Sequence, residues 1–364
     1  MKTISTLGQL QARTANLRRL ENDLAVKGQE VSTGKPKDLG KEIGPALKDL
    51  LALRSAFKKD ESYLASINVF ERRADIMTSA MSGIESAAVQ LQSVLVTNVP
   101  DASQTVGAVG VSADALLATV VSNLNTTLEG RFLFSGAAID QPALTEINTP
   151  SALTGLSPQD VIDGILDGTA YTPAQPAAFV GYTAAEAAAA ITRFDEVFDG
   201  TNAGAPAPLN DFSFERTFFG GVVGGPDVSV RIDATTTRDY GVSAEETAFR
   251  DLMQGAMMLQ SVDLVAMANT PAYEPYVTAA LDKMSAGLDG LRSEMAELGG
   301  VQQEAETRKA VLQAQKVVLN EQINALENVD QLEAQTRFTE IEKQIEASYA
   351  ATVRLSRLRL SNFL

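Results

Sequence analysis

The chain has 364 residues, of which 45% are hydrophobic and 21% are charged, and its formal net charge is −16. It contains neither Cys nor His, so disulfide bonds, thiolate nucleophiles and histidine-based catalytic or metal sites are excluded. Because so acidic a surface repels polyphosphate and anionic lipid, we expect no nucleic-acid partner. We also expect no cleaved signal peptide, no segment of membrane-spanning length and no membrane insertion.

The first helix is predicted from a seven-residue repeat near the N-terminus. Apolar side chains that recur at this spacing are typical of a coiled-coil seam. Gly34 and Pro36 should end the helix. The repeating residues are Leu10, Leu17, Leu24 and Val31.

Two more helices are expected before the chain changes character. Residues 46–99 contain one Gly and no Pro, and Pro100 follows them, which predicts a long helix. A second helix is predicted over residues 113–129, with Gly130 as its C-terminal cap. Residues 131–134, Arg-Phe-Leu-Phe, predict a short strand closed by Ser135 and Gly136.

The middle of the chain has a different composition. Eight of the thirteen prolines fall between residues 142 and 226, which excludes long helices there. Residues 184–190 are rich in Ala and predict a small helix, whereas apolar and polar residues alternate over 228–233 and predict a half-buried strand. This stretch is interpreted as an outer domain inserted into a helical rod.

Helix is expected to resume near Ser243, with Glu246 three residues later completing a capping box. Residues 301–364 contain neither Gly nor Pro and predict a very long helix, with a break around 328–330. Its last turns carry a broad apolar face. The members that we expect to form an interface are Ile341, Ile345, Val353, Leu355 and Phe363.

Regular apolar stripes at both termini are unusual, because chain ends are normally the frayed part of a domain. An amphipathic helix needs a partner for its apolar face, and the nearest candidate is the other terminus. An antiparallel pair would still leave part of the C-terminal face exposed, which favours a homo-oligomer or filament. An intramolecular bundle or a coiled-coil dimer would produce the same periodicity.

The predicted fold is mainly α, with a long antiparallel terminal coiled coil and a helical rod formed by both chain ends. A small mixed α+β outer domain is inserted in the middle. We predict three parts. The terminal polymerisation region comprises 1–45 plus 325–364, the rod comprises 46–136 plus 241–324, and the outer domain comprises 137–240.

Several dispersed motifs carry a resemblance to a known family. The sequence EVSTGK at 30–35 resembles the end of the first helix in flagellins and hook-associated proteins. The sequences YGVSA at 240–244, EASYAAT at 346–352 and LSNFL at 360–364 are similar to later family elements. An LFSG-type element, most like that of hook-associated protein 3, comprises Gly130, Arg131, Phe132, Leu133, Phe134, Ser135 and Gly136. The loop after Gly34 departs from the SDDP-like turn of the family.

The resemblance implies a secreted structural subunit at the hook–filament junction of the bacterial flagellum. Family members leave the cell by type III export without a cleaved signal peptide. The implied partners are further copies of the chain, hook-associated protein 1, flagellin and, before secretion, an export chaperone. We expect no enzyme activity, cofactor or metal site.

Three other interpretations stay open. The chain could be filament flagellin itself, which would be the major protein of sheared filaments, whereas a junction protein is minor. It could also be another helical type III-secreted protein, such as a tip or translocon component. The third interpretation is a lysine- or carboxylate-based hydrolase within 137–240, although no carboxylate pair or phosphate-binding loop there favours one.

Overall fold

The structure is a computed structural model that describes residues 6–98, 106–167, 183–199, 212–226 and 228–360. The fold is mainly α, as predicted. Unit 1 comprises residues 1–62 and 311–364, and unit 2 comprises residues 63–310. Two long helices, α3 (Leu47–Asn98) and α10 (Tyr273–Glu327), contribute residues to both units. The finer division into three parts stays a prediction.

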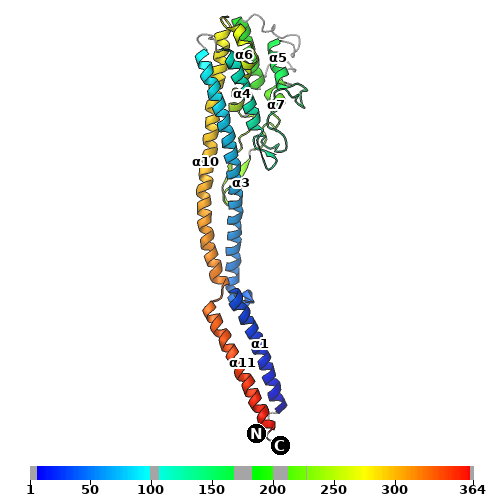
Figure 1. The fold of residues 1–364 in the computed structure, drawn as a ribbon, viewed down its shortest axis with the longest axis vertical. Coiled ribbons are helices and arrows are strands. Elements are labelled where there is room, and N and C mark those ends of the chain that lie inside the picture. Colours follow the sequence, from blue (N-terminus) through cyan, green and yellow to red (C-terminus); the bar gives the residue numbers. More distant parts are fainter. Residues whose placement is uncertain (1–5, 99–105, 168–182, 200–211, 227, 361–364) are drawn as a thin grey trace. The chain divides into compact units, whose positions relative to one another are not determined.

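Unit 1 contains the predicted antiparallel pair of terminal helices, α1 (Thr6–Thr33) and α11 (Gln331–Leu360) (Figure 1). The predicted end of the first helix is confirmed, because Gly34 follows α1 with a φ of 68°. The predicted break is confirmed too, since α10 ends before residue 328 and α11 begins after Asp330. Two short elements join α1 to α3, namely α2 (Leu39–Ile43) and the 3-10 helix η1 (Gly44–Ala46).

A second coiled-coil seam joins α3 to α10. In unit 2, the buried apolar residues of α3 other than Ala80 alternate in steps of three and four: Ile67, Phe70, Ala74, Met77, Met81, Ile84, Ala88, Leu91 and Leu95. Those of α10 include a seven-residue series: Met284, Leu291, Leu298, Ala305, Leu312 and Leu319. In unit 2, polar pairs at matching spacing flank the seam, with 2.8 Å between Arg292 Nε and Glu85 Oε1 and 3.0 Å between Gln92 Nε2 and Ser285 Oγ. These pairs fix the antiparallel register of the two helices.

Helix α8 (Thr247–Gln260) lies at the centre of unit 2. Apart from Arg250, every residue from Ala248 to Leu259 is buried. The helix packs closely on α10 because Gly287 has no side chain; a Cβ there would lie 2.8 Å from the Ala248 carbonyl oxygen. The short helix α9 (Leu264–Met267) follows α8.

Helix α4 (Val106–Leu124) corrects one expectation. It is long and apolar enough to cross a membrane by length and composition, contrary to the prediction that no segment would be. Eight of its residues are nevertheless buried inside unit 2, where it packs against α8 and α9. Its apolarity is accounted for by this position in the core.

The helix predicted over 113–129 extends too far, because α4 ends at Leu124. The chain leaves α4 at Leu124 and forms a hairpin of β1 (Thr127–Leu128) and β2 (Arg131–Phe132). Glu129 and Gly130 both have positive φ, 54° and 77°, as a type I′ turn requires. Gly130 is therefore a turn residue and not a helix cap. The predicted strand at 131–134 exists, but it is shorter.

The predicted capping box at Ser243 is also wrong. Helix α8 begins at Thr247 with Glu246 as its N-cap, and Glu246 makes no side-chain capping bond. Ser243 is instead 8% exposed, and its Oγ accepts a hydrogen bond of 3.3 Å from the Glu245 amide.

The inserted region contains short elements, as the prolines predicted. They are α5 (Pro158–Asp167), α6 (Ala184–Phe198), α7 (Phe214–Thr217) and the antiparallel hairpin of β3 (Ser229–Arg231) and β4 (Thr237–Asp239). The alternation predicted over 228–233 is confirmed, because Val230 and Ile232 are buried. Helix α6 packs on α8. Lys283 of α10 joins this contact, with its Nζ 3.3 Å from Asp195 Oδ1 and 3.2 Å from Asp251 Oδ1.

Candidate assembly surface

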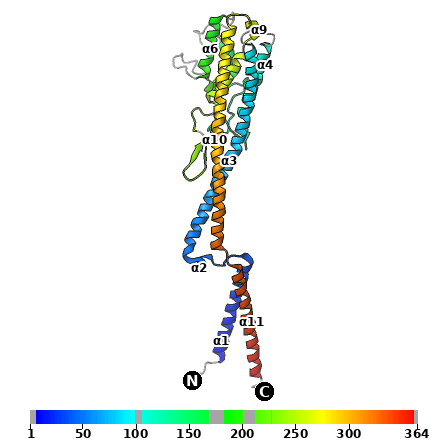
Figure 2. The ribbon, with the colours of Figure 1, turned by 90° about the vertical axis from the view of Figure 1, so that its left-hand side faces the viewer.

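The terminal pair of α1 and α11 carries most of the predicted interface residues. Both views show the two helices side by side (Figures 1 and 2). The seam is close at Gly28, where an added Cβ would lie 3.3 Å from Phe338 Cε2. Further along, the Tyr349 hydroxyl donates a hydrogen bond of 2.9 Å to Glu21 Oε1, which raises the pKa of the Tyr349 phenol. These contacts set the register of the pair.

Every predicted stripe residue whose side chain is described remains partly exposed in the single chain. The half-buried ones are Leu17, Leu24, Val31, Ile341 and Ile345. Val353 is 51% exposed. The side chains of Leu10 and Leu355, and the whole of Phe363, lie outside the described residues. Their assignment to an interface between copies stays a prediction.

The terminal pair buries far less than unit 2 does. Among the described side chains of α1 and α11, only Glu30 and Ala334 are buried. Leu332 of α11 is 76% exposed. Because full burial of a Leu or Ile contributes ~1.5–3 kcal/mol, each half-buried stripe residue leaves up to about a third of that gain unrealised in the single chain. The pair therefore retains apolar surface that another molecule could cover.

Charge is distributed unequally between the two units. Unit 1 has 18 Lys or Arg residues and 15 Asp or Glu residues, a net charge of +3. Unit 2 has 12 Lys or Arg residues and 31 Asp or Glu residues, a net charge of −19. Like charges repel over about 10 Å at an ionic strength of ~0.1 M. Copies of unit 2 therefore repel one another, whereas copies of unit 1 carry little net charge to oppose contact.

The LFSG-type element has a structural position in unit 2. Phe134 is fully buried, and its ring packs edge to face on Phe249 of α8 at a centroid distance of 6.2 Å. Its carbonyl oxygen accepts a hydrogen bond of 2.8 Å from the Ala244 amide. Ser135, also buried, donates from Oγ to the Ala138 carbonyl oxygen at 2.8 Å. The element thus joins the exit into the inserted region to the return from it.

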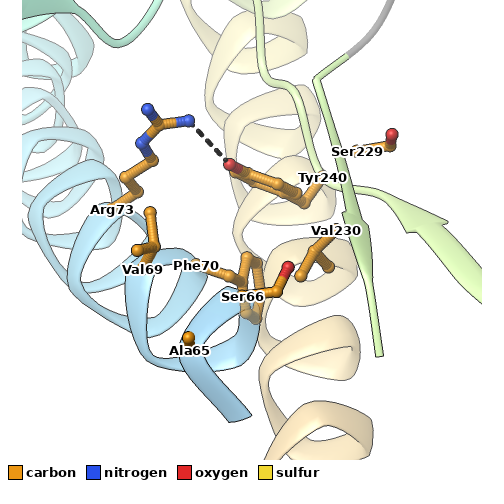
Figure 3. A pocket seen from close by; sticks show the side chains of 8 residues that line it. All are labelled: Ala65, Ser66, Val69, Phe70, Arg73, Ser229, Val230 and Tyr240. Atoms are coloured by element: carbon orange, nitrogen blue, oxygen red, sulfur yellow. Dashed lines mark hydrogen bonds between the residues drawn. The ribbon is translucent and has the colours of Figure 1, made fainter. Parts of the chain in front are cut away.

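A pocket lies between α3 and the segment that includes β3 (Figure 3). Its volume is about 360 Å³, and its lining includes the rings of Phe70 and Tyr240. Arg73 is the one charged residue in the lining, and it donates a hydrogen bond of 3.2 Å to the Tyr240 hydroxyl. The pocket lining therefore contains no carboxylate base or amine nucleophile. Within the described residues, no group of three or more acidic side chains is placed to hold a metal ion.

Residues 280–364 match the protein family described as "Bacterial flagellin C-terminal helical region". This C-terminal region of the chain is thus of the flagellin family. The matched residues include all of α11 and most of α10, and thus the whole C-terminal half of the predicted interface.

Two solved structures similar to this chain are described as flagellar proteins. A protein described as a flagellar hook-associated protein from Vibrio parahaemolyticus is 13% identical, with a TM-score of 0.49, over 78% of this chain and 97% of its own. FlgL from Bacillus cereus is 16% identical, with a TM-score of 0.46, over 75% of this chain and 100% of its own. No curated protein sequence matches the chain.

Proposed function

We propose that the chain is the subunit that joins hook-associated protein 1 to the flagellin filament at the hook–filament junction. It is exported by the flagellar type III route without a cleaved signal peptide, and an export chaperone binds it before secretion. The observation that carries this proposal is the half-buried apolar stripe on α1 and α11, in a chain whose C-terminal region is of the flagellin family.

The mechanism is folding coupled to assembly. The terminal pair gains less from burial in one chain than unit 2 does, and ordering its backbone costs roughly 1–2 kcal/mol per residue. Contact with neighbouring copies completes the burial of residues such as Leu24 and Ile345 and offsets this cost. The absence of Cys suits export of an unfolded chain, because no disulfide bond has to be reduced before the chain passes through the channel.

The unequal charge supports one orientation in the assembly. Copies that pack through unit 1 bring surfaces of low net charge together and not the acidic surfaces of unit 2. Residues 137–240, which belong wholly to unit 2, then form the outer surface. In this arrangement the inserted region contributes to what the outside of the ring presents and not to the contacts that build it.

A clean deletion of the gene, followed by electron microscopy of the cells, tests the proposal. The expected result is cells with hooks but no filaments, and flagellin shed into the medium. If the chain itself is the major protein of sheared wild-type filaments, it is filament flagellin and the junction assignment is wrong. Normal filaments in the deletion strain would overturn both assignments.

Two matched variants test which surface assembles. Val353 of α11 is 51% exposed and Val96 of α3 in unit 2 is 53% exposed, so Val→Asn at each removes a similar apolar surface. Complementation of the deletion strain with Val353→Asn should fail to restore filaments, whereas Val96→Asn should restore them. Equal complementation by both variants, at equal secreted amounts, would remove the terminal pair from the proposed interface.

A further inference from the structure

Two helix interruptions meet in unit 1. The first is the connection between α1 and α3, which begins at Gly34, and the second is the break at 328–330 between α10 and α11. The Val329 amide donates a hydrogen bond of 3.0 Å to the Gly34 carbonyl oxygen, so the two interruptions are directly bonded. We call these two segments the joint. All four helix portions that meet there belong to unit 1.

The side chain of Glu327 is bound at the joint. It is the last residue of α10 and is 5% exposed. Its Oε1 accepts a hydrogen bond of 2.5 Å from Arg54 Nε of α3, and its Oε2 lies 3.5 Å from Lys35 Nζ, one residue after Gly34. One carboxylate therefore connects α10, α3 and the end of α1.

Stability of α10 alone does not explain an acidic residue at this position. The C-terminal end of a helix carries partial negative charge, which disfavours a carboxylate there. A buried carboxylate is also costly unless cations and hydrogen bonds compensate it. Arg54 of α3 and Lys35 of the connection between α1 and α3 supply that compensation. The favourable energy of Glu327 therefore depends on the three segments being together.

Burial in the terminal pair is also concentrated at the joint. The two buried side chains among those described in α1 and α11 are Glu30, four residues before Gly34, and Ala334, four residues after Asp330. Asp330 caps α11, with its Oδ1 accepting a hydrogen bond of 2.9 Å from the Leu332 amide. Away from the joint, the described side chains of the pair are half-buried or exposed. The pair is thus held mainly at one end.

We propose that Glu327 is a positioning residue that fixes the direction in which the α1/α11 pair leaves α3 and α10 in unit 1. With the carboxylate in place, the two interruptions act as one rigid joint and not as two independent flexible connections. This inference rests on the proposed function, because a fixed direction presents the apolar stripe to a neighbouring copy in one geometry. Loss of the carboxylate frees the pair to sample many directions.

Distance measurements between spin labels on the full-length chain test the joint directly. The sequence contains no Cys, so Gln29→Cys, in the last turns of α1 beside the joint, and Gln313→Cys in α10 give unique labelling sites on exposed positions of unit 1. We expect one narrow distance distribution in the otherwise unchanged chain. Glu327→Gln and Glu327→Ala should both broaden it, whereas Glu321→Gln, at an exposed site on the same helix, should leave it narrow.

A parallel measurement separates an effect on the joint from a general loss of stability. The midpoint of thermal unfolding of α8, followed by a spectroscopic probe attached in unit 2, should be the same in the Glu327 variants as in the parent chain. A narrow distribution in Glu327→Ala would overturn the proposal, and so would a broad one in the parent chain. The charge reversal Glu327→Arg combined with Arg54→Glu should narrow the distribution relative to Glu327→Arg alone. These measurements do not require flagellar assembly, so the joint and the junction assignment fail separately.

Discussion

Two glycines in α10 provide a sharp test of the close packing in unit 2. Gly287 faces α8, and a Cβ there would lie 2.7 Å from Leu252 Cγ and 2.8 Å from both the Ala248 carbonyl oxygen and the Leu252 amide nitrogen. Gly299, on the same helix, has nothing within 4 Å of an added Cβ. The substitution Gly→Ala therefore adds the same methyl group at both sites, but this group clashes with α8 at Gly287 and meets no atom at Gly299.

The expected effects on the free energy of unfolding have opposite signs. An Ala in place of Gly in a helix interior contributes about 0.5–1 kcal/mol, and Gly299→Ala should gain that amount. At Gly287 the same gain is outweighed, because overpacking against backbone atoms costs about 1–3 kcal/mol and the backbone of α8 cannot rotate away as a side-chain end can. We expect Gly287→Ala to lose about 1–2 kcal/mol net.

Urea denaturation of the purified chain, followed by circular dichroism, measures both variants. The midpoint should rise for Gly299→Ala and fall for Gly287→Ala, with the slope of the transition unchanged. A shift of both midpoints in the same direction would refute the reasoning, because helix propensity alone would then explain the data. Gly287→Ser would separate size from propensity, since it adds one more atom at the same contact.

Three other predictions concern charge and order. Light scattering of the purified chain should show more assembly as salt rises from low to near-physiological concentration, because salt screens the repulsion between copies of unit 2, and a decrease with salt would contradict the charge argument. Asp233 accepts hydrogen bonds from the Thr235 and Thr236 amides, which lower the pKa of its carboxyl group to about 2. Its contribution to stability is therefore complete above pH 3.8 and is lost as the pH falls through about 2. Asp233→Asn should lower the free energy of unfolding at pH 7 but not at pH 2. Amides of α1 and α11 should exchange faster than those of α8 in the isolated chain and become protected on assembly, so strong protection before assembly would contradict coupled folding.

Much of the helical framework could be predicted from the sequence. Helix ends were well predicted where Gly or Pro interrupts a periodic segment, as at Gly34 and before Pro100. The break at 328–330 was also predicted. The seam of α10 was missed, although its seven-residue series from Met284 to Leu319 is present in the sequence. Small and polar residues between these positions, including Gly287 and Gly290, make the seven-residue apolar pattern hard to recognise in the sequence. The structure shows that these two glycines allow α8 to pack closely on α10.

The errors share a physical cause. Gly130 follows a helical segment and could cap it, but it also follows Glu129, and the pair can form a hairpin turn. Which role prevails depends on β2 having a partner strand, and that strand is a two-residue segment with no periodicity to detect. At Ser243 the Ala244 amide bonds to the Phe134 carbonyl oxygen, and the Glu246 amide bonds to the Ser243 carbonyl oxygen in a turn, so the helix begins later than the capping pattern predicted.

The assembly surface shows the limit of periodicity itself. The stripes of α1 and α3 have the same coiled-coil spacing, yet the residues of α3 in unit 2 are buried, whereas those described in α1 are half-buried. The difference comes from how many elements pack over each stripe, which we call its cover. In unit 2 a bundle of helices and the inserted region surround the seam, while in unit 1 the stripe of α1 has α11 as its one long neighbour. A stripe wider than its cover leaves apolar surface, and net charges of +3 and −19 decide which unit can bring copies together without repulsion. The proposed assembly therefore rests on the mismatch between stripe and cover, together with charge, and not on the heptad pattern alone.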